Sequence, residues 1–475
     1  MKVRTRYAPS PTGFMHIGNL RTAIFEYLLA KKYNGDFILR IEDTDQEREV
    51  EGAIDFIYNT LDLCGFKIDE GPNNEGNFGP YIQSKRKDIY KEYALKLVEM
   101  GKAYYCFCSE EELTKMREKA DARKKPFLYD GRCSRLSKEK IEENLKNNVP
   151  YVIRQKMPKE GVTIVEDLIY GKVKIDNSIL DDQILLKSDG FPTYNFANVI
   201  DDHLMEITHV IRGKEYLDQT AKYNLLYEAF GWEKPTYIHV AMVLGEDGNK
   251  LSKRNGDASF MDLYNEGYLP EAIVNYLSLL GWSPETNQEV FSMEELISNF
   301  NEERISKSSS QYDVKKLKWF NHQYINKMDD EKYLSWIKKY FSNECDKSEE
   351  WLNHLLLIYK SHLNYGNEIN ELTKKLTSSF FNKEFVIDAE AKEFMESDEV
   401  IPKVVEVFKE EIKSTSNWSV ETLQEVINNV KEKAGVKGKM LFMPIRIAAS
   451  GIMHGPELAD TLYLIGKEEI LNRLK

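Results

Sequence analysis

The chain has few cysteines and no long apolar run. Five cysteines occur in 475 residues, and Cys64 and Cys345 lie far from the others. This usage is typical of a reducing compartment rather than of a disulfide framework. No stretch of ~18 apolar residues is present, and the opening residues MKVRTRYAPS lack an apolar core of signal-peptide length. We therefore expect a cytoplasmic protein with no membrane segment.

Positive charge is in deficit. The chain has 65 Lys and Arg against 78 Asp and Glu, a net charge of −13, which argues against nonspecific binding of nucleic acid. A local basic face stays possible because a phosphate backbone responds to local potential rather than to total charge. Two clusters could supply one: Lys315, Lys316 and Lys318, and Lys431, Lys433, Lys437 and Lys439. The alternative is that they are solvated helix surface.

The first 45 residues predict a strand, a helix and a second strand. Residues 2–8 alternate as a short strand does, and Pro9 follows them. Apolar residues then recur at helical spacing until Asn34-Gly35, and residues 36–45 form the second expected strand. A strand, helix and strand in this order favour a parallel sheet.

The rest of the chain divides into three stretches. Residues 90–189 have many charges and no regular alternation, which indicates an insertion. Residues 191–203 are expected to be strand-rich, and the alternation resumes with a strand at 208–213, a helix at 217–230 and a strand at 237–244. After about residue 328 the strand signals fade. Helices are expected at 332–341, 351–365, 401–413 and 420–433, so this region is predicted to be all-α.

The stretch SPTGFMHIGNLRTA joins the first strand to the first helix. In open α/β sheets ligands bind at the carboxyl ends of the strands. The free N–H groups at a helix start suit an anion, above all a phosphate. Gly18 lets a ligand pack directly on the backbone, and His16 can donate to a phosphoryl oxygen. Alone, His16 would be interpreted as a structural histidine.

The stretch GEDGNKLSKRNG, residues 245–256, is polar and follows an expected strand. Lys250 and Lys253 are three residues apart, with Arg254 adjacent. A glycine-flanked loop with two lysines is suited to closing on charge that develops in a transition state. A basic surface loop is the alternative.

The two stretches together resemble the class I aminoacyl-tRNA synthetases. HIGN, residues 16–19, is similar to the first family signature, HIGH, and KLSKR, residues 250–254, is similar to the second, KMSKS. Further stretches resemble the bacterial glutamyl-tRNA synthetases over essentially the whole chain: RYAPSPTG, LRIEDTD, FPTYNFANVIDDH, VIRGKEYL and KGKMLFMPIRIAASG.

The resemblance implies an α/β fold with a Rossmann-type parallel sheet split by an insertion and followed by an all-α anticodon-binding region. The implied domains are the two catalytic halves, 1–88 and 191–244, the acceptor-end-binding insertion, 89–190, a stem-contact region, 245–326, and the helical anticodon-binding region, 327–475.

The resemblance also implies the reaction. The amino acid's carboxylate attacks the α-phosphorus of ATP, and a ribose hydroxyl at the tRNA 3′ end then captures the adenylate. No enzyme nucleophile is required, so positioning and charge stabilisation do the work. Magnesium would be bound mainly by the nucleotide. The residues matching catalytic positions are His16, Asn19, Lys250 and Lys253, and those matching ATP-binding positions also include Gly18, Glu215, Tyr216 and Leu244.

Glutamate would bring two carboxylates and one ammonium. Guanidinium groups bind carboxylates as a fork, and Arg6 and Arg212 match the family positions. The alternative for either arginine is a structural ion pair, and the sequence leaves open which one holds which carboxylate. Five further positions match the ammonium-binding and side-chain ends of the pocket: Glu42 with Ser10 and the Ala8 backbone, and Tyr194 with Asn198.

Three cysteines suggest a metal site. Cys106, Cys108 and Cys133 resemble a zinc knuckle that some relatives carry in the insertion, where a further cysteine or histidine follows. Here Ser134 and Arg135 occupy that region, and arginine is not a zinc ligand. Two interpretations stay open: a zinc site that Tyr129 completes weakly, or three neighbouring thiols without metal.

The implied partners are L-glutamate, ATP and tRNA-Glu, with tRNA-Gln as an open variant, and we expect a monomer. Unstacked anticodon bases can be bound by stacking, and the candidates Trp319, Phe320, Trp336, Trp351 and Trp418 are otherwise core residues. A glutaminyl enzyme would have a β-barrel C-terminal part, and a short paralogue that modifies a tRNA base would lack the last third. A tRNA-free nucleotidyltransferase and a non-catalytic RNA-binding module are the remaining alternatives.

Overall fold

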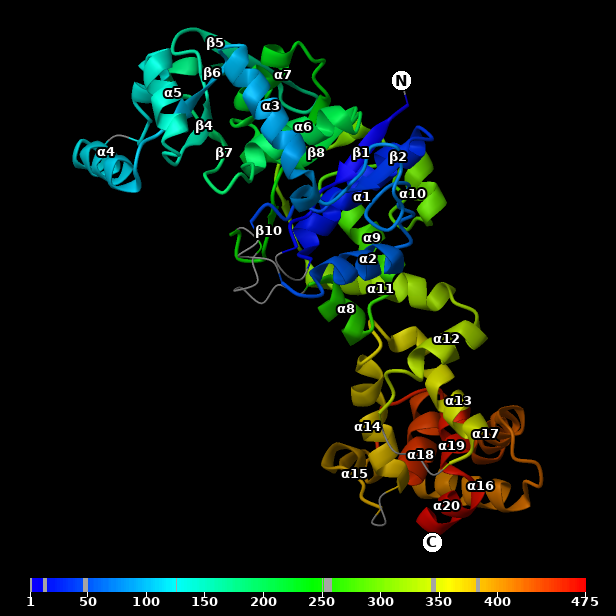
Figure 1. Ribbon diagram of the computed structural model, residues 1–475. Coiled ribbons are helices and arrows are strands. Elements are labelled where there is room, and N and C mark those ends of the chain that lie inside the picture. Colours follow the sequence, from blue (N-terminus) through cyan, green and yellow to red (C-terminus); the bar gives the residue numbers. More distant parts are fainter. Residues whose placement is uncertain are drawn as a thin grey trace. The chain divides into compact units, whose positions relative to one another are not determined.

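The computed structural model describes residues 2–11, 15–45, 50–124, 126–249, 251, 259–342, 347–381 and 385–475. The chain forms two compact units (Figure 1). The first contains residues 1–263 and 270–314, and the second contains residues 264–269 and 315–475.

The first unit is built on parallel strands, as the sequence predicts. β1 (Arg4–Tyr7) pairs in parallel with β2 (Asp36–Leu39), and β8 (His209–Gly213) pairs in parallel with β9 (Thr236–Val240). The Thr208 amide donates to the Arg4 carbonyl at 3.0 Å, which places β1 beside β8. The sheet is mixed at its far side, because β5 (Val162–Asp167) is parallel to β9 but antiparallel to β6 (Gly171–Asp176).

Helix α1 (Ile17–Lys32) connects β1 to β2 and starts at His16, whose Nδ1 accepts from the Gly18 amide at 3.1 Å. The turn after it needs glycine, because a Cβ at Gly35 would lie 2.2 Å from the Val3 carbonyl oxygen. The helix therefore packs directly on the strands that it joins, and its first turn lies at the carboxyl end of β1 (Figure 1).

The expected strand-rich stretch at 191–203 is wrong: helix α6 (Tyr194–Leu204) occupies it. Phe196, Ala197 and Ile200 are fully buried at helical spacing. Asp201 and Asp202 are both buried inside this helix, where they pair with distant arginines.

The insertion has a sheet of its own. β3 (Ala103–Cys106), β4 (Val152–Gln155) and β7 (Ile184–Leu186) are antiparallel neighbours. One hydrophobic core joins them to α3 (Lys87–Glu99), α6 and α7 (Thr220–Phe230). The remaining elements of the first unit are α2 (Ala53–Leu63), η2 (Gln83–Arg86), α4 (Glu110–Ala122), η3 (Arg132–Arg135), α5 (Lys138–Lys146), η4 (Asn177–Ile179), η5 (Lys214–Tyr216), β10 (Val243–Leu244), α9 (Pro270–Ser278), α10 (Met293–Asn299), η7 (Glu302–Arg304) and β11 (Ser310–Gln311).

A buried ion network joins five of these elements. Asp202 on α6 accepts from Arg6 Nε at 2.9 Å and from Arg40 Nη1 at 2.7 Å. Asp201 accepts from Arg86 Nε at 2.7 Å, and the same carboxylate accepts from the Tyr90 hydroxyl at 2.8 Å. These side chains come from β1, the end of β2, η2, α3 and α6, so the network fixes α6 against the sheet.

The second unit is helical in its described residues, apart from connections, as expected for the C-terminal region. The chain passes from one unit to the other within α8 (Phe260–Glu266) and at the first residue of α11 (Val314–Lys327). The second unit itself contains α12 (Asp330–Ile337), α13 (Glu349–Ile358), η8 (Lys360–His362), α14 (Glu368–Phe381), α15 (Ala389–Met395), α16 (Ile401–Ser414), α17 (Val420–Ala434), α18 (Lys439–Ser450), α19 (Leu458–Ile465) and α20 (Lys467–Arg473).

Two of the tryptophans proposed for stacking are tied to the helix packing. Trp351 and Trp418 donate their indole N–H groups to the Leu464 and Tyr463 carbonyls at 2.8 and 3.2 Å. Trp319 is 38% exposed, and the Lys316 ammonium lies 4.1 Å from its ring.

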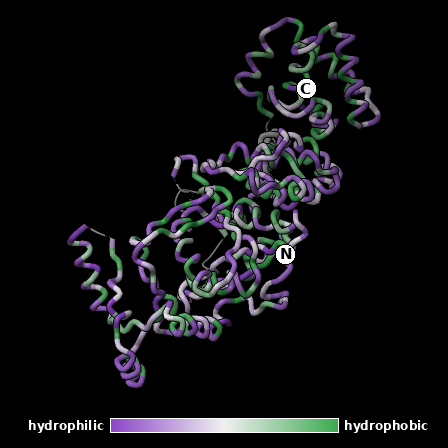
Figure 2. Tube along the Cα trace, turned by 90° about the horizontal axis from the view of Figure 1, so that it is seen from above, coloured by the Kyte–Doolittle hydropathy of each residue, from purple (hydrophilic) through white to green (hydrophobic). Residues whose placement is uncertain are grey.

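Hydrophobic and hydrophilic residues alternate along the helices of both units (Figure 2). Among the residues that the structure describes, no helix is long and apolar enough to cross a membrane.

We predict that Asp201→Asn destabilises the first unit by about 3–5 kcal/mol, because it removes the charge partner of a buried guanidinium. Urea unfolding, with hydrogen exchange in α3 and α6, measures the effect. The exposed Asp218 provides the control, since Asp218→Asn should change stability by less than ~0.5 kcal/mol. Equal effects of the two substitutions would contradict the structural role of the network.

Candidate active site

A cavity of about 400 Å³ lies at the carboxyl ends of β1 and β8, beside the start of α1. The structure brings most of the predicted site residues to its wall. Those that line it are Arg6, Ala8, Ser10, His16, Gly18, Asn19, Glu42, Tyr194, Arg212, Glu215 and Tyr216. They come from both halves of the sheet, so residues about 200 positions apart in the sequence share one site.

The first turn of α1 forms one end of the cavity. Because the Gly18 amide donates to His16 Nδ1, a neutral His16 carries its hydrogen on Nε2, where it can act as a donor. A Cβ at Gly18 would lie 3.2 Å from that Nδ1, so a larger residue would press on the imidazole. The positive end of the helix dipole and the His16 N–H group together suit a negatively charged ligand.

Arg6 is buried and already paired. Asp202 accepts from its Nε at 2.9 Å and its Nη2 at 3.4 Å, and Glu26 accepts from its Nη1 at 3.1 Å. Burial raises the pKa of Glu26 well above its usual range, against the influence of Arg6. For Asp202, burial acts in the same direction, but Arg6 and Arg40 outweigh it and keep the pKa low. The firm counter-charge of Arg6 is therefore Asp202.

Arg212 is buried without a carboxylate partner. Its Nε donates to His239 Nε2 at 3.1 Å and its Nη2 donates to the Thr220 hydroxyl at 2.7 Å. Its guanidinium carbon lies 4.6 Å from the Tyr223 ring centroid and 5.7 Å from that of Tyr216. Among the described residues, Nη1 of Arg212 makes no hydrogen bond and no acid forms an ion pair with it. The group is thus a cation at the cavity wall that has capacity for an anion.

Glu42 is buried and lines the same cavity. Its Oε1 accepts from Arg40 Nη2 at 3.0 Å, whereas Oε2 has no hydrogen-bond partner in the described part of the chain. Burial raises the pKa of Glu42 to about 7, although Arg40 and Arg6 oppose the shift. A cationic ligand group at Oε2 would favour its ionised form.

Two predicted residues lie outside the cavity wall, and two are not described. Asn198 on α6 is buried, and its Nδ2 makes no hydrogen bond with the described residues. Leu244 ends β10, and its neighbour Val243 lines the cavity instead. Lys250 and Lys253 lie outside the described residues.

The sequence analysis missed several residues at this site. Arg21 lines the cavity one turn into α1 and donates to the Leu280 carbonyl at 2.9 Å. Burial lowers the pKa of Arg21 to about 10. Arg21 is three residues after Gly18, so the two residues share one face of the helix. This spacing could have indicated from the sequence that Arg21 lies at the site. His239 and Glu26 gave no comparable signal, because their partners are distant in the sequence.

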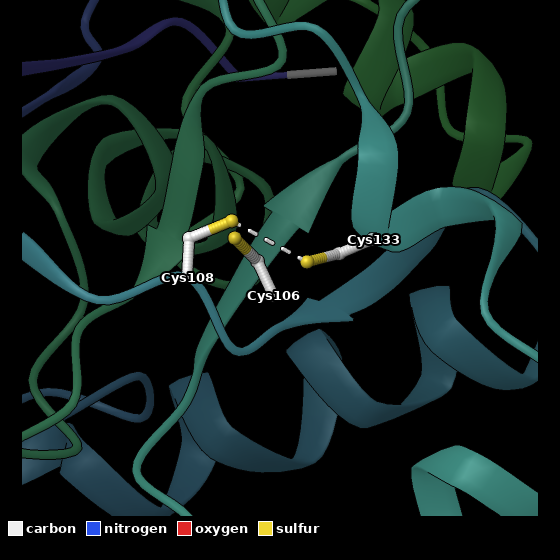
Figure 3. Close-up of side chains that lie close together, drawn as sticks. All are labelled: Cys106, Cys108 and Cys133. Atoms are coloured by element: carbon white, nitrogen blue, oxygen red, sulfur yellow. Dashed lines mark hydrogen bonds between the residues drawn. The ribbon is translucent and has the colours of Figure 1, made fainter. Parts of the chain in front are cut away.

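The three cysteines converge in the insertion (Figure 3). Cys106 ends β3, Cys108 follows it and Cys133 lies in η3, and their sulfur atoms are all within 4.8 Å of one another. The Tyr129 hydroxyl lies 3.3 Å from the sulfur atoms of both Cys106 and Cys108. The cluster therefore offers three sulfur ligands and one oxygen around a common centre.

The comparisons with known proteins agree with this geometry. A family model described as the catalytic domain of class I tRNA synthetases (E and Q) matches residues 2–319, and a model described as an anticodon binding domain matches residues 326–475. The chain belongs to the class I tRNA synthetases of this type.

Individual relatives show to which kind of tRNA synthetase the chain belongs. The glutamate–tRNA ligases of Clostridium botulinum (strain Hall) and Clostridium tetani are 50% and 48% identical to it, over 100% of this chain and 97% of each relative. The crystal structure of a glutamate tRNA ligase from Elizabethkingia meningosepticum in complex with its amino acid has a TM-score of 0.91 at 38% identity, covering 100% of this chain and 98% of that one. Within its class, the chain belongs to the glutamate–tRNA ligases.

Proposed function

We propose that the protein activates L-glutamate with ATP and Mg²⁺ and transfers the glutamyl group to the 3′-terminal ribose of tRNA-Glu. The glutamate carboxylate attacks the α-phosphorus, pyrophosphate leaves, and the ribose hydroxyl then displaces AMP. The observation that carries the proposal is the cavity itself, because its wall contains both the start of α1 and Arg212, which has no carboxylate partner among the described residues.

The charge of the site matches glutamate. Arginines and glutamates both line the cavity: Arg6, Arg21 and Arg212, and Glu26, Glu42 and Glu215. Arg6 already has Glu26 and Asp202 as partners, whereas Arg212 has no carboxylate partner among the described residues. Glutamate brings two carboxylates and one ammonium near neutral pH, so Arg212 offers a cation for a carboxylate and Glu42 offers an acceptor for the ammonium.

Arg212 is the better candidate for the side-chain carboxylate, and Arg6 the weaker one. Arg6 has Asp202 as a partner, so a ligand would gain less from its charge. Arg212 has none among the described residues, and it lies against Tyr223 in the same region as Asn198. Tyr194 on α6 also lines this end. Glu42 would hold the ammonium at the other end, with Ser10 and the Ala8 carbonyl.

The nucleotide would occupy the end formed by α1. His16 and Asn19 would donate to the phosphates while Gly18 allows close approach, and Glu215, Tyr216 and Leu244 would contact the adenosine. Lys250 and Lys253 would stabilise the charge that develops on the triphosphate, with magnesium held mainly by the nucleotide. Tyr216 and Tyr194 have ring centroids 5.8 Å apart, which supports a shared wall between nucleotide and amino acid.

The tRNA would contact several parts of the chain. We assign the acceptor end to residues 89–190, between the catalytic halves 1–88 and 191–244, the stem to residues 245–326 and the anticodon to residues 327–475. The family model for residues 326–475 supports the last assignment. We further propose that the protein acts as a monomer in the cytoplasm.

We also propose that the cysteine cluster binds a structural zinc ion, with Tyr129 as the fourth ligand. Structural zinc sites in proteins are tetrahedral with N, O or S ligands. The donor set fits, because the Tyr129 hydroxyl lies 3.3 Å from the sulfur atoms of Cys106 and Cys108, and Cys106 and Cys133 are both buried. The ion would connect β3 to η3 within the insertion.

Charging of purified tRNA-Glu and tRNA-Gln with labelled glutamate, in separate reactions, tests the function. We expect stable charging of tRNA-Glu, together with ATP–pyrophosphate exchange that is weak with glutamate alone and strong once tRNA is added. Charging of both tRNAs would identify the broader variant of the activity. Exchange without any charging would contradict the proposal.

For selectivity, we predict that Arg212→Gln lowers the kcat/KM ratio of glutamate over glutamine by roughly 100-fold or more from an expected ~10⁴–10⁵. Glutamine presents an amide N–H to a donor, and the buried guanidinium loses its counter-charge. The control His16→Asn should slow both amino acids equally and keep the ratio. A larger loss of the ratio in Arg6→Gln than in Arg212→Gln would assign the side-chain carboxylate to Arg6 instead.

For the metal site, we predict one zinc per purified chain by elemental analysis. Cys133→Ser should lose most of this zinc, and Tyr129→Phe should release it faster to a chelator because one ligand is missing. Cys64 is buried and distant from the cluster in sequence, so Cys64→Ser should keep the full content. Metal-free protein purified under zinc-replete conditions would show that the cluster is three thiols only.

A further inference from the structure

The Arg212 guanidinium is oriented by His239, which is not among the residues that line the cavity. Arg212 lies on β8 and His239 lies at the paired position of the neighbouring strand β9. The Arg212 Nε donates to His239 Nε2 at 3.1 Å, and Thr220 on α7 accepts from Nη2 at 2.7 Å. These two partners hold Nε and Nη2 of Arg212, whereas Nη1 makes no hydrogen bond with a described residue.

Asp167 sets which nitrogen of His239 carries the hydrogen. Its Oδ2 lies 2.7 Å from His239 Nδ1 and also accepts from the His239 backbone amide at 3.0 Å. A carboxylate accepts only, so the imidazole carries its hydrogen on Nδ1 and presents a lone pair on Nε2. Only this tautomer can accept from Arg212, because an N–H at Nε2 would face the Arg212 N–H.

The environment keeps this imidazole neutral. Both the His239 and the Asp167 side chains are fully buried. Burial lowers the pKa of His239 below its usual range, Asp167 opposes the shift and the charge of Arg212 reinforces it. The groups that face the ring are Asp167 from β5, Arg212 from β8, Thr220 from α7 and the more distant Glu215 from η5.

We propose that His239 and Asp167 are a positioning pair for substrate discrimination: the neutral imidazole holds the Arg212 guanidinium at the geometry that accepts a side-chain carboxylate and rejects an amide. Arg212 has a long, flexible side chain, and a group held in place before binding loses less entropy when the ligand arrives. This inference rests on the proposed role of Arg212 in glutamate binding, and it assigns His239 no contact with the substrate.

The first test compares two variants at position 239. Glutamine at this position can offer an amide oxygen near the place of Nε2, whereas leucine offers no acceptor. We expect His239→Leu to lower the glutamate-over-glutamine kcat/KM ratio by roughly 10- to 100-fold, the range of one hydrogen bond to a buried charged group. His239→Gln should recover most of the ratio. The KM for ATP serves as the internal control and should stay within about twofold in both variants.

The second test uses the pH profile of the same ratio. As pH falls through the lowered pKa of His239, protonation replaces the acceptor with a donor, so the ratio of the parent protein should hold near neutral pH and fall below about pH 6.5, the usual imidazole value. Glu42 titrates close to this range, because its pKa is about 7. In the proposed site it faces the ammonium that glutamate and glutamine share, so its effect cancels in the ratio. The His239→Gln variant should give a flat profile.

The outcomes separate this inference from the function on which it rests. A parent protein that does not activate glutamate would overturn the proposed function. If the parent activates glutamate but His239→Leu keeps the full ratio, or if Leu and Gln variants lose it equally while the ATP KM is unchanged, the positioning role is overturned. A variant that fails to fold is identified by its thermal melt, and the pH profile of the parent then decides alone.

Discussion

The site depends on one constraint, which is that Asp202 must be buried between two arginines. Asp202 belongs to α6, whereas its partner Arg6 lies in β1 and its partner Arg40 follows β2, so the pairing brings the two halves of the catalytic sequence together. An unpaired carboxylate or guanidinium at this depth would cost several kcal/mol, so the elements have little freedom to shift independently. The position of Tyr194 at the start of α6, and that of Glu42 beside Arg40, both follow from it.

The same pairing gives Arg6 and Arg212 different roles. Asp202 satisfies Arg6, which then serves mainly to fix β1 against α6. In the described part of the chain, Arg212 donates to His239 and Thr220 and to no carboxylate, so its charge is available to a ligand. Two arginines of equal charge and similar burial thus differ in what they can bind. The difference lies in their partners and not in the residue type.

Much of the architecture was predictable, because it is encoded in short-range patterns. The strand–helix–strand unit, the His16–Asn19 turn and the helical C-terminal region all follow from local periodicity and turn residues. Helix α6 was not predictable in this way, because Asp201 and Asp202 favour a helix interior only once Arg86 and Arg40 are beside them. Two features could not be predicted from spacing along the chain, because they depend on contacts between distant residues. These are the different partners of Arg6 and Arg212, and the position of Tyr129 among the cysteines.

The hairpin of β5 and β6 connects the insertion to the Arg212 side chain. β5 meets β9 through a single paired position, Asp167 with Tyr237, and the same Asp167 holds His239 through its side chain. A substitution that slides the hairpin along the sheet would therefore reach Arg212 through two hydrogen bonds. Engineering of the insertion and engineering of amino-acid preference are thus not independent problems in this chain, and libraries that vary one should keep residue 167 and its strand register unchanged.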